Sequence, residues 1–185
     1  MKKYIVFLRG INISGKNKIS MPALKEELNK AGFLDVSTYL NSGNIALVSD
    51  DNNIRLKIEN IIKNKFNLDI QAYVIEADAL KDILSHVPEW WNSPDKSKYD
   101  NLIFILSEDS PQDVCRMIGE PSESLEEIQV YDRVIFWTFD RKQYQKCNWW
   151  KKTASNGIAE KLIIRTAGTV LKVYFRRGRT ARETV

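Results

Sequence analysis

The chain has 185 residues, which suits one large domain or two small ones, because domains commonly run ~100–150 residues. Apolar residues make up 43% of it and charged residues 28%, so we expect a globular core. No stretch reaches the ~20 apolar residues that span a bilayer, and the apolar run Tyr4–Leu8 is too short for a signal peptide. We therefore expect a cytoplasmic protein.

The first half of the chain has the pattern of a ferredoxin-like unit. The expected elements are a buried strand at 4–8, a helix from the cap Ser20 to Gly32, an edge strand at 36–40, a return strand at 45–48, a helix that begins at 51 or 52 and runs to 66, and a closing strand at 70–74. The Asn-Ser-Gly-Asn sequence at 41–44 predicts a tight turn. The order is βαββαβ.

A second half repeats this order after a connecting segment. Residues 77–99 carry a short helix at 79–85 and then prolines and tryptophans, which are typical of a connection. The repeat is a strand at 102–106, a helix from Ser110 to Gly119, strands at 128–130 and 134–137, a helix capped by Asp140 that runs to Lys151, and a strand at 162–164. A last helix is expected at 169–176.

The predicted fold class is therefore α+β, with two ferredoxin-like βαββαβ halves, antiparallel sheets and a C-terminal helix. The predicted divisions are 1–76, a connecting segment at 77–99, and 100–185, which includes the last helix and a basic tail. Right-handed crossovers place the first and third strand of each half at the centre of its sheet.

Charge is concentrated at the two ends of the chain. The net charge is +4, yet residues 1–25 contain six basic and no acidic residues, and residues 172–185 contain five basic residues and one acidic residue. The segment between them is therefore net acidic. A sequence pI of about 9.0 reflects the two ends and is weak support for a nucleic-acid-binding body.

Metal and cofactor signals are absent from the sequence. Cys115 and Cys147 are far apart and have no Cys or His neighbours at ligand spacing, so we expect reduced structural thiols, no metal and no cofactor. The single histidine, His86, excludes a mechanism that needs two.

Several short segments together resemble a known family. They are Leu8-Arg9-Gly10-Ile11-Asn12, Gly15-Lys16-Asn17-Lys18, Met21-Pro22, Gly32-Phe33, Thr38-Tyr39, Ser42-Gly43-Asn44 and, near the end, Ile164-Arg165-Thr166-Ala167-Gly168-Thr169. The pattern resembles the bacterial family called domain of unknown function 1697, although Thr166 and Gly168 stand where that family usually has asparagines. The resemblance implies a bacterial cytoplasmic protein and carries no activity or catalytic residue.

The loop after the first strand is the main candidate for a ligand site. Its glycines and cations could form a concave array of amides and charges that holds an anion. It is not expected to be a phosphate-binding P-loop, because Asn17 replaces the Ser or Thr and the helix cap follows only at Ser20. Arg9 and Lys16 would pair with the anion, and Asn12 would orient it. The candidate ligand-binding residues are Arg9, Gly10, Asn12, Gly15, Lys16, Lys18, Ser42, Asn44 and Arg165.

Two features of this prediction stay open. In a simple ferredoxin-like unit we expect the loops that carry these residues to lie at opposite strand ends. The sequence therefore does not show whether these loops come together in one site. The tryptophan pairs at 90–91 and 149–150 could stack on unpaired bases, although packing is the stronger interpretation, and they could also anchor a homo-oligomer.

The leading functional hypothesis is the binding of an anionic ligand, such as a phosphorylated metabolite, a nucleotide or nucleic acid, without chemistry of its own. One alternative is an enzyme that acts on a small phosphorylated or acyl substrate with Arg9, Lys16 and an unidentified carboxylate. Another alternative is an oligomeric assembly module.

Overall fold

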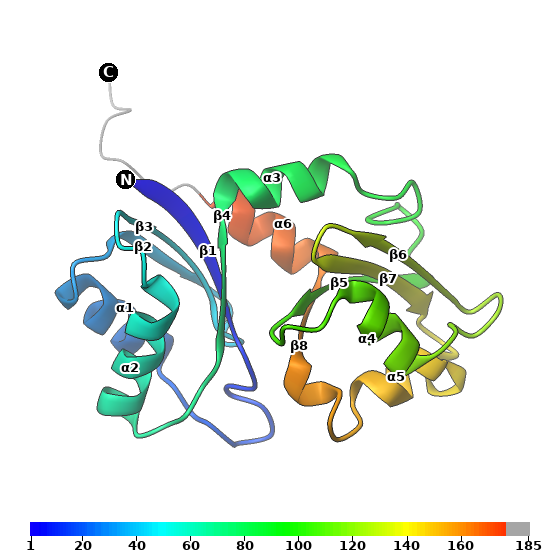
Figure 1. Ribbon diagram of the computed structural model, residues 1–185, viewed down its shortest axis with the longest axis horizontal. Coiled ribbons are helices and arrows are strands. Elements are labelled where there is room, and N and C mark those ends of the chain that lie inside the picture. Colours follow the sequence, from blue (N-terminus) through cyan, green and yellow to red (C-terminus); the bar gives the residue numbers. More distant parts are fainter. Residues whose placement is uncertain (177–185) are drawn as a thin grey trace. The chain divides into compact units, whose positions relative to one another are not determined.

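The computed structural model describes residues 1–176, and the expected basic tail beyond Arg176 lies outside these described residues. The chain forms two compact units (Figure 1). Unit 1 comprises Met1–Lys81 and Leu171–Val185, and unit 2 comprises Asp82–Val170. The helices α3 (Ala77–Ser85) and α6 (Ala167–Phe175) each contribute residues to both units.

Unit 1 contains one four-stranded antiparallel sheet with two helices on one face (Figure 1). Its elements are β1 (Lys2–Leu8), α1 (Met21–Lys30), β2 (Leu34–Tyr39), β3 (Asn44–Ser49), α2 (Ile54–Phe66) and β4 (Ala72–Glu76). The strand order β2-β3-β1-β4 confirms that the first and third strands are central. Ser20 caps α1 as predicted, since its hydroxyl accepts a hydrogen bond from the Ala23 amide.

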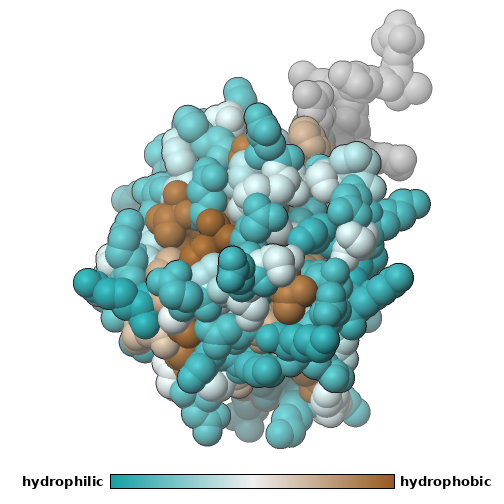
Figure 2. Space-filling model, turned by 90° about the vertical axis from the view of Figure 1, so that its right-hand side faces the viewer, coloured by the Kyte–Doolittle hydropathy of each residue, from teal (hydrophilic) through white to brown (hydrophobic). Residues whose placement is uncertain are grey.

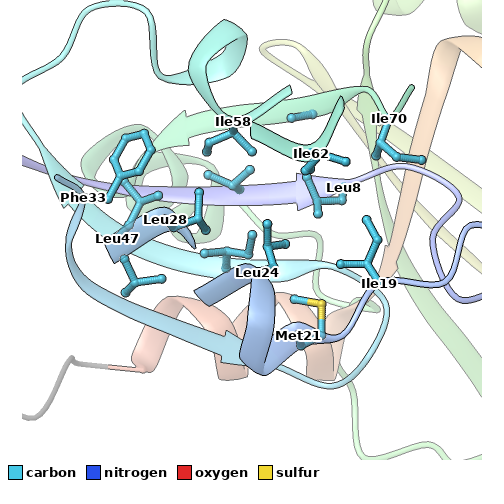
Figure 3. Packing of buried hydrophobic residues seen from close by; sticks show 14 of the residues in the cluster. Leu8, Ile19, Met21, Leu24, Leu28, Phe33, Leu47, Ile58, Ile62 and Ile70 are labelled. Atoms are coloured by element: carbon cyan, nitrogen blue, oxygen red, sulfur yellow. The ribbon is translucent and has the colours of Figure 1, made fainter. Parts of the chain in front are cut away.

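The core of unit 1 lies between this sheet and its helices. Figure 3 shows Leu24 and Leu28 of α1 and Ile58 and Ile62 of α2 directed toward side chains of the strands, including Leu8. All five are fully buried, and burial of one such side chain stabilises a fold by about 1.5–3 kcal/mol. The 3.6-residue spacing of the apolar positions on both helices is thus what attaches them to the sheet.

Unit 2 repeats the arrangement with the strand order β6-β7-β5-β8. Its elements are β5 (Lys98–Ile105), α4 (Pro111–Ile118), β6 (Glu126–Tyr131), β7 (Val134–Asp140), the 3-10 helix η1 (Tyr144–Lys146), α5 (Asn148–Thr153), the 3-10 helix η2 (Ala159–Lys161) and β8 (Leu162–Thr166). The predicted α+β class, with two βαββαβ units and a C-terminal helix, is confirmed.

The predicted helix from Asp140 to Lys151 is wrong in its extent. Asp140 ends β7, and its carboxylate accepts hydrogen bonds from the amides of Lys142 and Gln143 at 2.8 and 2.9 Å. Only η1 follows, and Cys147 is extended before α5 begins. The reason is tertiary: the buried Glu126 carboxylate accepts the Trp149 amide at 3.2 Å, which sets the start of α5 eight residues after Asp140.

The adjacent tryptophans divide between packing and exposure. Trp91 and Trp149 are buried, and their indole N–H groups donate to the carbonyls of Asn101 and Gly119 at 2.7 and 2.9 Å. The packing interpretation therefore holds for one member of each pair. Trp150 is 42% exposed, so it remains open to another molecule.

Candidate functional site

The surface seen in Figure 2 is largely polar. Figure 2 shows a face on which most side chains are hydrophilic and the apolar ones form small separate patches. Along residues 1–176, no helix has the length and apolar character needed to cross a bilayer. In the same range no group of three or more His, Cys, Asp or Glu side chains is placed to hold a metal ion.

The loop between β1 and α1 folds into a small hairpin. The Asn12 amide donates to the Asn17 carbonyl at 3.1 Å, and the Lys16 amide donates to the Ile13 carbonyl at 2.9 Å. Ser14 and Gly15, the two residues at its tip, both have positive φ, as a two-residue hairpin turn of the I′ type requires. The amides of Asn12 and Lys16 are thus used within the loop, in contrast to the free amides of a P-loop.

Asn12 joins this hairpin to the turn between β2 and β3. Its side-chain amide donates to the Asn41 carbonyl at 2.7 Å and to the Ile19 carbonyl at 2.9 Å. Its side-chain oxygen accepts the Ile19 amide at 2.9 Å. The side chain of Asn12 is therefore a clamp between the two loops, and its orientation of a bound anion stays a prediction.

The expectation that the two loops lie at opposite strand ends was wrong. β1 and β3 are antiparallel with Phe7 paired to Asn44, so the end of β1 meets the start of β3. The Leu8 amide also donates to the Gly43 carbonyl at 2.8 Å. The loop after β1 and the turn before β3 therefore share one end of the sheet.

Gly43 makes this close approach possible. Its φ is +79°, and a Cβ at this position would lie 2.6 Å from the Leu8 Cβ and 2.9 Å from the Ile11 Cδ1. Beside it, Asn44 is fully buried and donates its side-chain amide to the Tyr39 carbonyl and the Ser42 hydroxyl, both at 2.9 Å. The predicted site residues Ser42 and Asn44 thus build the turn that Asn12 holds.

The cations of the loop lie on its outer surface. Lys16 and Lys18 are exposed, whereas Arg9 is half-buried and its backbone amide donates to the Gln71 carbonyl at 2.9 Å. Within residues 1–176, neither Lys16 nor Lys18 forms an ion pair. Lys16 and Lys18 therefore project, without a paired carboxylate, from a loop that the hydrogen bonds of Asn12 hold in place.

The remaining candidate, Arg165, belongs to unit 2. It lies on β8 opposite Leu102 of β5, and one of its guanidinium N–H groups donates to the Ile164 carbonyl at 2.9 Å. Burial lowers the pKa of Arg165 to about 10, a value at which the guanidinium is still charged at neutral pH. Arg165 is therefore a residue of unit 2, whereas the loop between β1 and α1 belongs to unit 1.

A cavity of about 510 Å³ in unit 1 was not predicted from the sequence. It lies between the first residues of β1, the end of β3 and the start of α2. Some of its lining charges are already in ion pairs: Lys2 with Glu76 at 2.8 Å, and Asp51 with Lys57 at 3.1 Å. Each pair is neutral, so these groups offer a ligand little electrostatic attraction.

The single histidine belongs to an exposed cluster in unit 2. The His86 ring stacks on Tyr131 with 4.2 Å between centroids, and the Tyr131 hydroxyl donates to the Asp82 carboxylate at 2.8 Å. This hydrogen bond raises the pKa of the Tyr131 phenol, so the phenol stays protonated at neutral pH. The cluster therefore lacks the lowered pKa that a nucleophilic or basic tyrosine needs.

The two thiols have ordinary structural surroundings. Cys147 is buried and Cys115 is half-buried, and both are free. Burial raises the pKa of both thiols, which disfavours the reactive thiolate.

Sequence reasoning missed a second cleft, in unit 2. It has a volume of about 360 Å³ and is lined by Tyr99, Phe139, Arg141, Tyr144 and Trp150. Of these residues, Trp150 belongs to a tryptophan pair that the sequence marks as a possible platform for unpaired bases. The signal in the sequence was the segment 141–152, which holds five basic residues, three aromatic residues and no acidic residue.

Comparison with known proteins supports a family assignment. The chain is similar to a solved structure described as conserved bacterial protein SP0830 from Streptococcus pneumoniae, with 26% identity, a TM-score of 0.80, and coverage of 94% of this chain and 97% of that chain. Among curated proteins none matches. The model of the family described as "Protein of unknown function (DUF1697)" matches residues 1–136. Together with the loop and turn that carry the resemblance noted above, this match shows that the chain belongs to the DUF1697 family.

Proposed function

We propose that the protein binds an anionic ligand, such as a phosphorylated metabolite, a nucleotide or nucleic acid, on the hairpin loop between β1 and α1. The observation that carries the proposal is the clamp at Asn12, which fixes the loop to the β2–β3 turn. Because the loop is already ordered, the binding of a ligand by its two exposed lysines does not carry the entropic cost of ordering the loop backbone.

The charge distribution supports an anion as the ligand. Residues 1–25 contain six cations and no acid, and Lys16 and Lys18 project from this segment. Two unit charges 4 Å apart attract by about 1 kcal/mol in bulk water and about 4 kcal/mol near a protein surface. Two lysines can therefore supply useful attraction to a phosphate, with an affinity that falls as salt rises.

The hydrogen bonds inside the loop indicate how the ligand would be held. The amides of Asn12 and Lys16 are already bonded, so ammonium groups rather than a ring of amides would contact the anion. Lysine acts as a point charge and imposes little geometry. We therefore expect selectivity for charge, with pyrophosphate and nucleoside triphosphates preferred over monophosphates.

The test is a binding titration with pyrophosphate and ATP at low and at physiological salt. The double variant Lys16→Ala/Lys18→Ala should weaken binding of both ligands about 3- to 10-fold, in line with the loss of two surface charges. The matched control is Lys63→Ala/Lys81→Ala, which removes two exposed helical lysines and should leave affinity unchanged. Equal effects of the two double variants would mean that only net charge matters and would reject the loop as the site.

A further inference from the structure

The cleft of unit 2 is built from four aromatic rings and one guanidinium. Tyr99 and Phe139 are directly opposite one another on β5 and β7, with 5.3 Å between ring centroids. The Trp150 ring contacts Phe139 and Tyr144 edge-on, with centroids 5.4 and 4.9 Å apart. A volume of about 360 Å³ is at the small end of ligand pockets, which run ~300–1,000 Å³, so the cleft suits one planar group.

The exposed ring of Trp150 is positioned by the residues that precede it in the chain. The carboxylate of Glu126 accepts the amide of Trp149 at 3.2 Å, and the side-chain amide of Asn148 donates to the Glu120 carbonyl at 2.7 Å. These hydrogen bonds fix Asn148 and Trp149 at the start of α5, and Trp150 follows Trp149 on the same helix. A ring that is 42% exposed yet carried by a fixed helix can stack on a ligand with little loss of freedom.

The charge at the cleft excludes a cation as its occupant. The Arg141 guanidinium lies over the Tyr99 ring, 4.8 Å from its centroid, and lines the cleft. Across the described residues 1–176, Arg141 makes no ion pair with a carboxylate. A methylammonium group, the usual guest of an aromatic cage, would be repelled by this charge. An anionic group beside a planar ring would be attracted.

The basic charge continues beyond the cleft. Four further exposed lysines lie in the same segment, outside the lining residues: Lys142, Lys146, Lys151 and Lys152. A single nucleotide would be contacted by Arg141 alone, whereas a strand that leaves the cleft would pass further cations. Aromatic rings for bases beside a basic track for the backbone are the combination that binds single-stranded nucleic acid.

We propose that this aromatic cleft binds an unpaired base of single-stranded nucleic acid, with the base stacked on the Trp150 and Tyr144 side and Arg141 at the adjoining phosphate. The cleft is independent of the loop site between β1 and α1, and its residues come from unit 2 alone.

The experiment is fluorescence anisotropy of a labelled 12-nucleotide single strand with the full chain at several salt concentrations. It is performed in the Lys16→Ala/Lys18→Ala background, so that the loop contributes little. Trp150→Ala should weaken binding about 5- to 100-fold, because loss of one base–aromatic stack has an effect of that size. Trp150→Phe should retain most of the affinity, since it keeps a ring. Trp90→Ala, which removes a half-exposed tryptophan outside the cleft, should have no effect.

Three further measurements distinguish a single strand from other anionic ligands. Arg141→Ala should weaken binding and reduce its salt dependence, since one phosphate contact is lost. A mononucleotide should compete at least 10-fold more weakly than the strand, and a duplex of the same length should bind more weakly than the single strand. Equal affinity of Trp150→Ala and its parent in a folded protein would overturn the proposal. A mononucleotide or a duplex that binds as tightly as the single strand would also overturn it.

Discussion

The side-chain amide of Asn12 lies 2.7 Å from the backbone carbonyl of Asn41, 29 residues further along the chain. This hydrogen bond joins the loop after the first strand to the turn before the third. The same side chain also bonds the amide and carbonyl of Ile19, where the chain enters α1. One asparagine therefore connects three segments at one end of the sheet of unit 1.

Substitution of Asn12 should reveal this clamp. Asn12→Gly removes three hydrogen bonds at an unchanged backbone conformation, because glycine tolerates the φ of +55°. At about 0.5–1.5 kcal/mol for each bond, the free energy of unfolding in urea should fall by about 1.5–4.5 kcal/mol. Asn12→Ala should be about 1 kcal/mol worse, since it adds left-handed strain. A loss below 0.5 kcal/mol in both variants would show that the clamp contributes little.

Gly43 should be the least replaceable glycine of unit 1. In Gly43→Ala the new methyl group would meet the Leu8 side chain at 2.6 Å, so we expect a loss of about 2–4 kcal/mol. Gly10→Ala is the matched control, because Gly10 has a similar positive φ of +65° and nothing within 4 Å of an added Cβ. Gly10→Ala should lose about 1 kcal/mol. If Gly43→Ala and Gly10→Ala lower the stability equally in thermal or urea unfolding, a clash with Leu8 is not the cause of the loss.

Glu126 should stabilise unit 2 through its charge-assisted hydrogen bonds. This buried carboxylate accepts three N–H donors, from the amides of Ser122 and Trp149 and the indole of Trp137. Glu126→Gln turns an N–H donor toward these donors and should reduce the free energy of unfolding by about 2–4 kcal/mol. The neighbouring exposed Glu127→Gln should change it by less than 0.5 kcal/mol. If Glu126→Gln and Glu127→Gln have a similar free energy of unfolding, the hydrogen bonds of the Glu126 carboxylate do not stabilise unit 2.

Asp109 should make stability depend on pH in the acidic range. Lys161, 2.6 Å away, and the Ser107 hydroxyl, 2.7 Å away, hold the pKa of Asp109 below its ordinary value. A lowered pKa in the folded state means stabilisation that is present above the unfolded value of ~3.9 and is lost as pH falls through the folded pKa. Asp109→Asn should therefore unfold at a lower temperature than the parent at pH 7, and the difference should shrink below about pH 4.

The exposed Asp69→Asn serves as the control for this pH dependence, because Asp69 is in no ion pair among the residues that the structure describes. It should melt like the parent at every pH. An Asp109→Asn difference that is constant from pH 7 to pH 3 would show that the ion pair is not its cause.

Local signals explain how much of the fold could be predicted. Ser20, Ser110 and Gly119 bound α1 and α4 as expected, because caps act through hydrogen bonds within a few residues. The start of α5 could not be predicted, because it depends on Glu126, 23 residues from Trp149. The candidate sites, too, depend partly on local sequence and partly on contacts between distant residues. The loop cations were visible in the sequence, whereas the clamp at Asn12 and the cleft around Trp150 need strand pairing that brings distant residues together.

An amide NMR titration of the full chain with pyrophosphate at low salt tests anion binding by the loop most directly. If the loop binds the anion, the largest shift changes fall on residues 13–18 and on the turn at 41–43, which Asn12 couples to them. In Lys16→Ala/Lys18→Ala the same shift changes should need about 3- to 10-fold more pyrophosphate. Shift changes confined to other parts of the chain, or unaltered in that double variant, would contradict anion binding by this loop.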